Sequence, residues 1–340
     1  MLQSINDSNA NPDVVYPLLQ QNLALLNDGM IEVLKDWVSS KFAEVDRDSQ
    51  RLIAFNIGNF GHLVLKSPIG DKATNVELSI CCYELASPVF SIDEDPENWL
   101  IIQDNFVFAS FHRIKGDRSE NLEKSISFGE AALDIATKKY FPIDRARLQI
   151  GLAHTYRKRI TGNRLENLNQ AIEYYQAALV IFTVESFPLE WTIIQVNLAL
   201  LSINQLRNYE VATEHLQAAY QQLSKNHSDT DLLARTMFEL ARCFHKTGAL
   251  GQAKMYFKDA MRLYQRLEQT TQVAAVTSEL GNLELQMGQI DDARIHLQTA
   301  LEFYQAANNL DLPEGMRLDR IASIQELQKY LPVSSEKIAS

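Results

Sequence analysis

Three consecutive carboxylates, Asp93, Glu94 and Asp95, form a candidate cation-binding segment, because calcium prefers oxygen ligands. A calcium loop also needs a glycine within the turn and a distal glutamate, and here Pro96 follows instead. We therefore expect an acidic lead-in to a helix N-terminus, where carboxylates interact favourably with the helix dipole. The segment predicts no metal site.

Catalytic groups and cofactor-binding loops often leave spacing signatures, and none is present in this sequence. It contains no Gly-rich phosphate loop, no His-Glu-x-x-His, no Cys-x-x-Cys and no Gly-x-Ser-x-Gly. The 7 histidines are scattered, without a pair at helix-face ligand spacing. We expect a non-catalytic protein without a cofactor. The alternative is an active site assembled from distant residues around His154 or His245.

Composition narrows the possible partners. The formal charge is -11, which argues against a general nucleic-acid binder or a protein resting on anionic lipid. The cysteines, Cys81, Cys82 and Cys243, are too few and too poorly spaced for a disulfide framework or a zinc site. No secretory signal or membrane-spanning run is visible. We expect a soluble, cytoplasmic protein.

The elements that would position any functional group are repeated along the chain. Residues of the same type recur every 46 positions: Gly70, Gly116 and Gly162; Pro96, Pro142 and Pro188; Gln103, Gln149 and Gln195. Each unit has a proline where a helix can begin and a Gly-Asp-Arg type turn where it can end. Between them, apolar residues recur at steps of three and four, as in Leu168, Ile172, Tyr175 and Leu179. Each repeat is therefore predicted to be a pair of amphipathic helices.

Further along the chain the interval shortens to 40, from Leu240-Ala241 to Leu280-Gly281. This order of small and aromatic residues resembles the tetratricopeptide repeat. The longer units, with Phe187-Pro188-Leu189-Glu190-Trp191, look more narrowly like the repeats of large bacterial proteins that carry a caspase-like CHAT domain. The resemblance implies an all-α fold, a right-handed α-solenoid of stacked antiparallel helix pairs.

The predicted organisation has four parts. Residues 1–12 are expected to be disordered, 13–45 to form an N-terminal helical pair, 46–308 the repeat array, and 309–340 a capping helix and tail. Stacking is required because neither helix of a pair can bury its apolar stripe alone.

In a tetratricopeptide array the first helices of successive pairs line a concave face, so the resemblance implies that equivalent residues form ladders along it. Three ladders are candidates for binding a partner. The first is Asn59, Asn105, Gly151 and Asn197; the second is Lys66, His112, Lys158, Asn204 and Lys246; the third is His62, Phe108, His154, Leu200, Arg242 and Asn282.

Each ladder has a functional and a structural interpretation. The amides of the first can hold a peptide backbone, or can bond between helices. The cations of the second suit an acidic peptide or a free carboxylate, or simply stabilise helix C-termini. The third varies as a sequence-selective surface or a solvated face would. The recurring Arg113, Arg159, Arg118 and Arg164 fit either account.

The leading hypothesis is a scaffold or adaptor whose concave surface binds a peptide segment or helix of another protein. The alternative is a regulatory sensor that responds to a peptide or ligand and controls a separately encoded effector. No nucleic-acid or membrane partner is expected.

Overall fold

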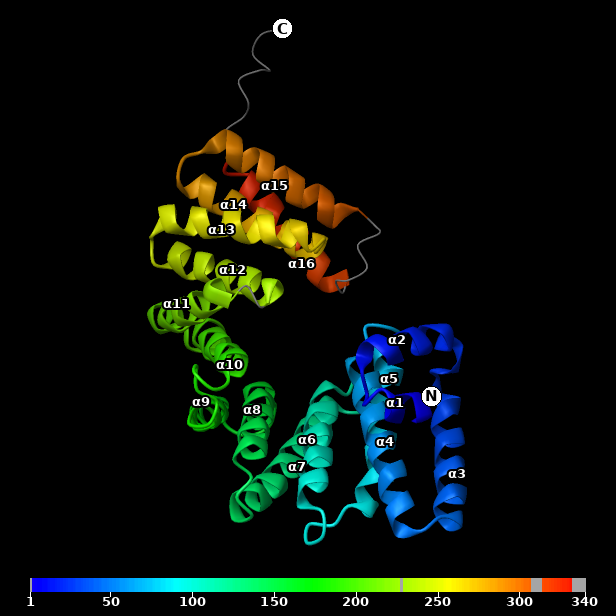
Figure 1. The fold of residues 1–340 in the computed structure, drawn as a ribbon. Helices are drawn as coiled ribbons and strands as arrows, with labels where there is room; N and C mark the ends of the chain where they lie inside the picture. The colour runs from blue at the N-terminus through cyan, green and yellow to red at the C-terminus, as the bar shows by residue number, and fades with distance from the viewer. Residues whose placement is uncertain (1, 227–228, 307–313, 332–340) are drawn as a thin grey trace, which may run out of the picture. The chain divides into compact units, whose positions relative to one another are not determined.

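The computed structural model describes residues 2–226, 229–306 and 314–331, and every regular element in these ranges is helical. The chain divides into two compact units, Met1–Thr183 and Val184–Ser340. No helix among the described residues is both long and apolar enough to cross a membrane. The predicted all-α solenoid of stacked helix pairs is confirmed, with three hairpins in each unit (Figure 1).

The N-terminal unit contains nine α-helices among its described residues. They are α1 (Leu2–Asp7), α2 (Pro12–Gln21), α3 (Asp28–Glu44), α4 (Arg47–Lys66), α5 (Lys72–Ala86), α6 (Pro96–His112), α7 (Arg118–Lys138), α8 (Pro142–Lys158) and α9 (Arg164–Leu179). The pairs α4–α5, α6–α7 and α8–α9 form hairpins, and each hairpin also packs against the next.

The 46-residue repeat is explained by the turn inside each of these hairpins. The turn glycine has a positive φ, +84° at Gly116, which suits a residue without a Cβ. The next residue, Asp117, caps the second helix by accepting a hydrogen bond from Glu120 N. Arg118 then donates back to the Phe111 carbonyl, and Arg164 donates to Arg157 O in the following hairpin.

A second recurring contact joins each hairpin to the one before it. Arg113 makes a bidentate pair with Glu77, at 2.8 and 2.7 Å, and Arg159 makes the same pair with Glu123, at 2.9 and 2.8 Å. Bidentate guanidinium–carboxylate pairs fix geometry as well as adding energy. The four recurring arginines therefore hold the hairpins together, which decides between the two interpretations of their recurrence.

The first 45 residues differ in part from expectation. Where residues 1–12 were expected to be disordered, α1 lies against α4 and Ile5 is fully buried. Burial of that apolar side chain offsets the entropy of ordering so short a helix. Helices α2 and α3 occupy the predicted 13–45 region, and Val15 and Val38 join the same core.

The C-terminal unit repeats the hairpin plan. Its α-helices are α10 (Pro188–Leu201), α11 (Tyr209–Asn226), α12 (Thr230–Lys246), α13 (Leu250–Arg266), α14 (Thr270–Gln286), α15 (Ile290–Gln305) and α16 (Glu314–Gln328), with a π-helical turn, Ser202–Leu206, after α10. Helix α16 buries Ile324 against Leu297 and Tyr304 of α15. Residues 309–313 and 332–340 of the predicted C-terminal part lie outside the described residues.

Candidate functional site

A continuous set of accessible residues runs along the first helices of the three N-terminal hairpins. Along each helix these residues are spaced by four, three and four positions, so they share one helix face. They are Phe55, Asn59, His62 and Lys66 on α4; Ile101, Asn105, Phe108 and His112 on α6; and Arg147, Gly151, His154 and Lys158 on α8. Helix α6 packs beside both α4 and α8, so the three stripes adjoin. We call this surface the A face.

The A face exposes large apolar side chains. Phe55 is 41% exposed, Ile101 38% and Phe108 41%. Other apolar side chains of the same helices, such as Phe60 on α4 and Phe106 on α6, are buried. Phe55, Ile101 and Arg147 form a fourth ladder, at the same 46-residue interval, that the sequence analysis missed. The interval itself was the signal that could have found them. Exposed aromatic side chains next to cations are typical of surfaces that bind proteins.

Phe108 lies at the centre of the contacts on this face. Lys66 Nζ lies 5.9 Å from the centroid of the Phe108 ring, and the His112 ring lies 4.3 Å from it. Beside them, His62 Nδ1 is 3.0 Å from Asn105 Oδ1. The structure thus brings residues of all three predicted ladders together, and it does so across the α4–α6 contact.

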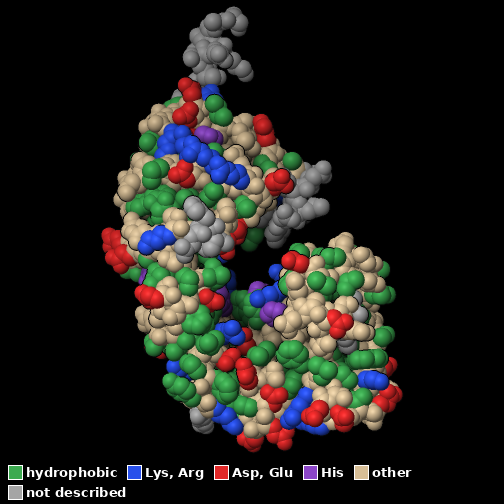
Figure 2. Space-filling model, in the orientation of Figure 1, with side chains coloured by type: hydrophobic (Ala, Val, Ile, Leu, Met, Phe, Trp, Pro, Cys, Tyr) green, Lys and Arg blue, Asp and Glu red, His purple; other side chains and the backbone are tan. Residues whose placement is uncertain are grey.

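The C-terminal end of the A face is surrounded by positive charge. Burial, and then Lys72 and Arg118, lower the pKa of His112 to about 4. Burial, and then Arg157, Arg164 and Arg118, lower the pKa of Lys158. The charged neighbours that shift both groups are all cations, although the protein is acidic overall. Figure 2 shows lysine, arginine and histidine side chains next to one another on the surface of the N-terminal unit.

One carboxyl group, Asp104 of α6, lies between the stripes of α4 and α8. Burial, and to a smaller extent the nearby carboxylate of Asp144, raise its pKa to about 6, against the opposing effect of Arg147 and Lys66. Burying a carboxylate costs free energy unless charge partners and hydrogen bonds replace its water. Carboxyl groups whose pKa is raised by burial occur most often at functional sites, although burial of the charge lowers stability.

Asp104→Asn is expected to stabilise the protein by about 1–2 kcal/mol at pH 8 and by less than about 0.5 kcal/mol at pH 4. The folded pKa lies above the unfolded one, so the aspartate form opposes folding, fully above about pH 6 and not at all below the unfolded pKa. Urea unfolding of both proteins at the two pH values measures this. An equal effect at both would show that charge is not the cause.

Three predicted ladder residues in the C-terminal unit do not lie on such a surface. Asn197 is only 8% exposed and donates to Ile193 O of its own helix, so it cannot hold a partner's backbone as the first ladder proposed. Leu200 is buried, because α10 is apolar on nearly all sides. Asn204 falls in the π-helical turn, which displaces it from the helical ladder.

The remaining candidates are Arg242, Lys246 and Asn282 of this unit and the two histidines considered for an active site, His154 and His245. Arg242 pairs with Glu239 at 2.8 Å and is further compensated by Glu279, so its charge is already balanced. Lys246 is exposed at the end of α12, and Asn282 is partly exposed on α14. His154 of the A face makes edge contacts with Phe111 and Tyr175, whereas His245 is buried with Nε2 2.9 Å from Gln286 Oε1.

The acidic run before α6 has the structural role that was expected of it. Asp95 caps α6 by accepting from Asn98 N, Glu94 pairs with Arg51, and Asp93 pairs with Lys139. In the described part of the chain, no group of three or more His, Cys, Asp or Glu residues is arranged to hold a metal ion.

Comparison with known proteins supports the class that this architecture defines. Residues 192–266 match the model of the tetratricopeptide repeat family. None of the curated proteins compared matches the chain. The stacked hairpins and this match show that the chain has the fold of a tetratricopeptide-repeat solenoid. The narrower resemblance to the repeats of CHAT-domain proteins stays a prediction.

Solved structures share the fold at low identity. BtubC (BKLC) from P. vanneervenii is 18% identical with a TM-score of 0.55, and the alignment covers 70% of this chain and 91% of that one. A STAND ATPase with a tetratricopeptide repeat sensor, PH0952 from Pyrococcus horikoshii, is 13% identical with a TM-score of 0.58, covering 96% and 46%. NprR, in complex with its cognate peptide NprX, is 14% identical with a TM-score of 0.51, covering 94% and 87%.

Proposed function

We propose that this chain is a non-catalytic scaffold or adaptor that binds a peptide segment or helix of another protein on the A face. The observation that carries the proposal is the juxtaposition of the exposed Phe108 with Lys66 and His112, contributed by two adjacent hairpins. An aromatic anchor supplies most of the burial energy in such interfaces, and flanking charges set specificity.

The partner segment is expected to be acidic as well as apolar. The cations around Lys158 and His112 repel one another, and carboxylates of a partner would relieve that repulsion. A general polyanion such as nucleic acid is disfavoured by the net charge of -11, which would repel it over the rest of the surface. We expect such a protein in the cytoplasm, because its three cysteines are buried and unpaired and cytoplasmic thiols are kept reduced.

The test is affinity capture from native lysate with the full-length protein, read by mass spectrometry. Partners of the A face should be lost with Phe108→Ala and also with the double change Lys66→Glu and Lys158→Glu, each weakening binding tenfold or more. Lys246→Glu is the matched control, because Lys246 is exposed at a helix end outside the A face. If every captured protein survives both A-face variants, the proposal is wrong.

A second candidate function is a regulatory sensor that responds to a peptide or ligand. Its support is the sensor array of the STAND ATPase and the peptide complex of NprR, which share this fold. Arrays whose units contact only their neighbours can change pitch on binding. X-ray scattering with and without a captured partner peptide distinguishes the two functions. At saturation a sensor of this kind must change its scattering envelope, whereas an unchanged envelope rules out the pitch change.

A further inference from the structure

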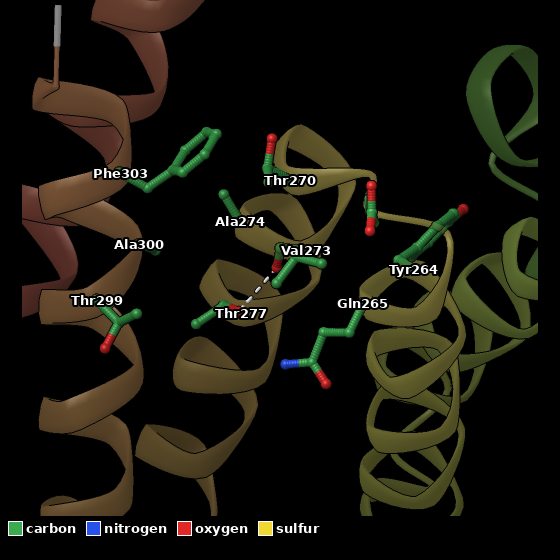
Figure 3. Close-up of a pocket in the computed structure, with 10 residues that line it drawn as sticks. Tyr264, Gln265, Thr270, Val273, Ala274, Thr277, Thr299, Ala300 and Phe303 are labelled. Carbon is green, nitrogen blue, oxygen red and sulfur yellow. Dashed lines mark hydrogen bonds between the residues drawn. The ribbon is translucent and has the colours of Figure 1, made fainter. Parts of the chain in front are cut away.

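The C-terminal unit contains a pocket that is separate from the A face. It has a volume of about 350 Å³, within the range of small-ligand sites. It is lined by the end of α13, the first half of α14 and the second half of α15 (Figure 3): Tyr264, Gln265, Glu268, Thr270, Val273, Ala274, Thr277, Thr299, Ala300 and Phe303. Most of this lining is apolar, and two of its residues, Tyr264 and Phe303, are aromatic.

The pocket exists because two side chains are shorter here than in the preceding repeat. At the interval of 40, Val273 and Thr277 occupy the positions of two longer residues, Leu233, which is 9% exposed, and Met237, which packs against the core that α10 to α14 share. Thr277 uses its hydroxyl on Val273 O within its own helix, so it presents a methyl group rather than a polar group to the space. The same backbone plan therefore carries longer side chains at these two positions in one repeat than in the next.

A strained residue lies at this pocket. Helices α12, α13 and α14 end in the same turn, with paired backbone hydrogen bonds that satisfy the last carbonyls. The left-handed position is glycine after α12 and α14, at Gly248 and Gly288, but it is Glu268 after α13, with φ +57°. A non-glycine residue in this conformation costs about 1 kcal/mol, and such strain is typical of functional sites.

Glu268 supplies a negative charge to a largely apolar space. Among the described residues it takes part in no ion pair, although its side chain lines the pocket. A carboxylate beside aromatic walls favours an organic cation, because the ring faces and the carboxylate both attract positive charge while the walls bury the hydrocarbon part.

We propose that this pocket binds a small organic amine, an alkyl or arylalkyl ammonium whose hydrocarbon part packs between α14 and α15 and whose charge pairs with Glu268. Two observations converge on it: the open volume that the short side chains of Val273 and Thr277 leave, and the strained carboxylate at Glu268. Tyr264 and Phe303 provide the aromatic walls.

Three ligands of similar shape and different charge test this proposal on the full-length protein. They are 2-phenylethylamine, 2-phenylethanol and phenylacetate, followed by methyl NMR of Val273, Ala274 and Ala300. The amine should bind at least tenfold more tightly than phenylacetate, a difference of about 1.4 kcal/mol. Unmoved methyl signals at saturating amine, or equal binding of the three ligands, would overturn it.

Variants separate a binding role from a packing role. Glu268→Gln should abolish the preference for the amine, and Glu268→Gly should do so while raising thermal stability, since it relieves the left-handed strain. Thr277→Met should fill the space and abolish binding of all three ligands. Val273→Leu is a second filling variant in case Thr277→Met fails to fold. Undiminished amine binding in a folded filling variant would contradict the assigned site.

Discussion

Replacing Phe257 by alanine is expected to destabilise the C-terminal unit by about 3–5 kcal/mol. Phe257 of α13 is fully buried in the core that joins α10 to α14. Its ring lies 5.9 Å from Phe238 and 6.5 Å from His245, both on α12, so truncation leaves a cavity inside one hairpin. Urea unfolding measures the loss, and hydrogen exchange should locate it in α12 and α13.

The same substitution at Phe108 is the matched control. Phe108 is 41% exposed, so Phe108→Ala should change the free energy of unfolding by less than about 0.5 kcal/mol while weakening partner binding. Both phenylalanines lie on helices of the repeat hairpins, but neighbouring helices cover the ring of Phe257 and leave that of Phe108 exposed. A large stability loss at Phe108 would mean that the A face is part of the core and not a binding surface.

Replacing Glu284 by alanine is expected to cost about 3 kcal/mol. Glu284 of α14 is fully buried, with Oε1 2.8 Å from Lys254 Nζ and Oε2 2.6 Å from His296 Nδ1. Its removal leaves Lys254, which is 16% exposed, with a hydrogen bond to Gln289 Oε1 and with the longer 3.5 Å contact to the carboxylate of Asp292. A partly buried cation without its carboxylate is unfavourable because little water replaces the lost partner.

Glu302→Ala is the control for this experiment, since Glu302 is an exposed carboxylate on α15. It should change the free energy of unfolding by less than about 0.5 kcal/mol. Unfolding by urea at pH 7 compares the two variants with the parent protein. A loss below 1 kcal/mol for Glu284→Ala would show that Lys254 and His296 are solvated well enough to need no buried carboxylate.

The hairpins and their stacking could be predicted from local features of the sequence. Proline at helix starts, glycine in the turns and the apolar periodicity are local constraints, so they can be identified without knowing what packs against them. The small residue Gly281 shows the same principle at close range. A Cβ there would lie 2.8 Å from Leu297 Cγ, which is why the pattern keeps a small residue where α14 meets α15.

The sequence could not decide which repeated polar residues serve the fold. Arg113 and Arg159 recur as regularly as Lys66 and Lys158, but the arginines are engaged with glutamates of the preceding helix. Asn59 and Asn197 share a ladder, yet one is partly exposed and the other is buried. The spacing of residues along the sequence shows which of them share a helix face. Whether that face is exposed depends on which neighbouring helices pack over it.

Only the tertiary structure revealed the A-face cluster around Phe108, the buried Glu284 pairs and the pocket beside Glu268. Each depends on contacts between different helices, and the distances involved are set by packing. The sequence fixes side-chain order along one helix because helical geometry is regular. It leaves open how far apart two helices lie and which side chains meet between them, because that depends on the summed volumes of all the residues at their contact.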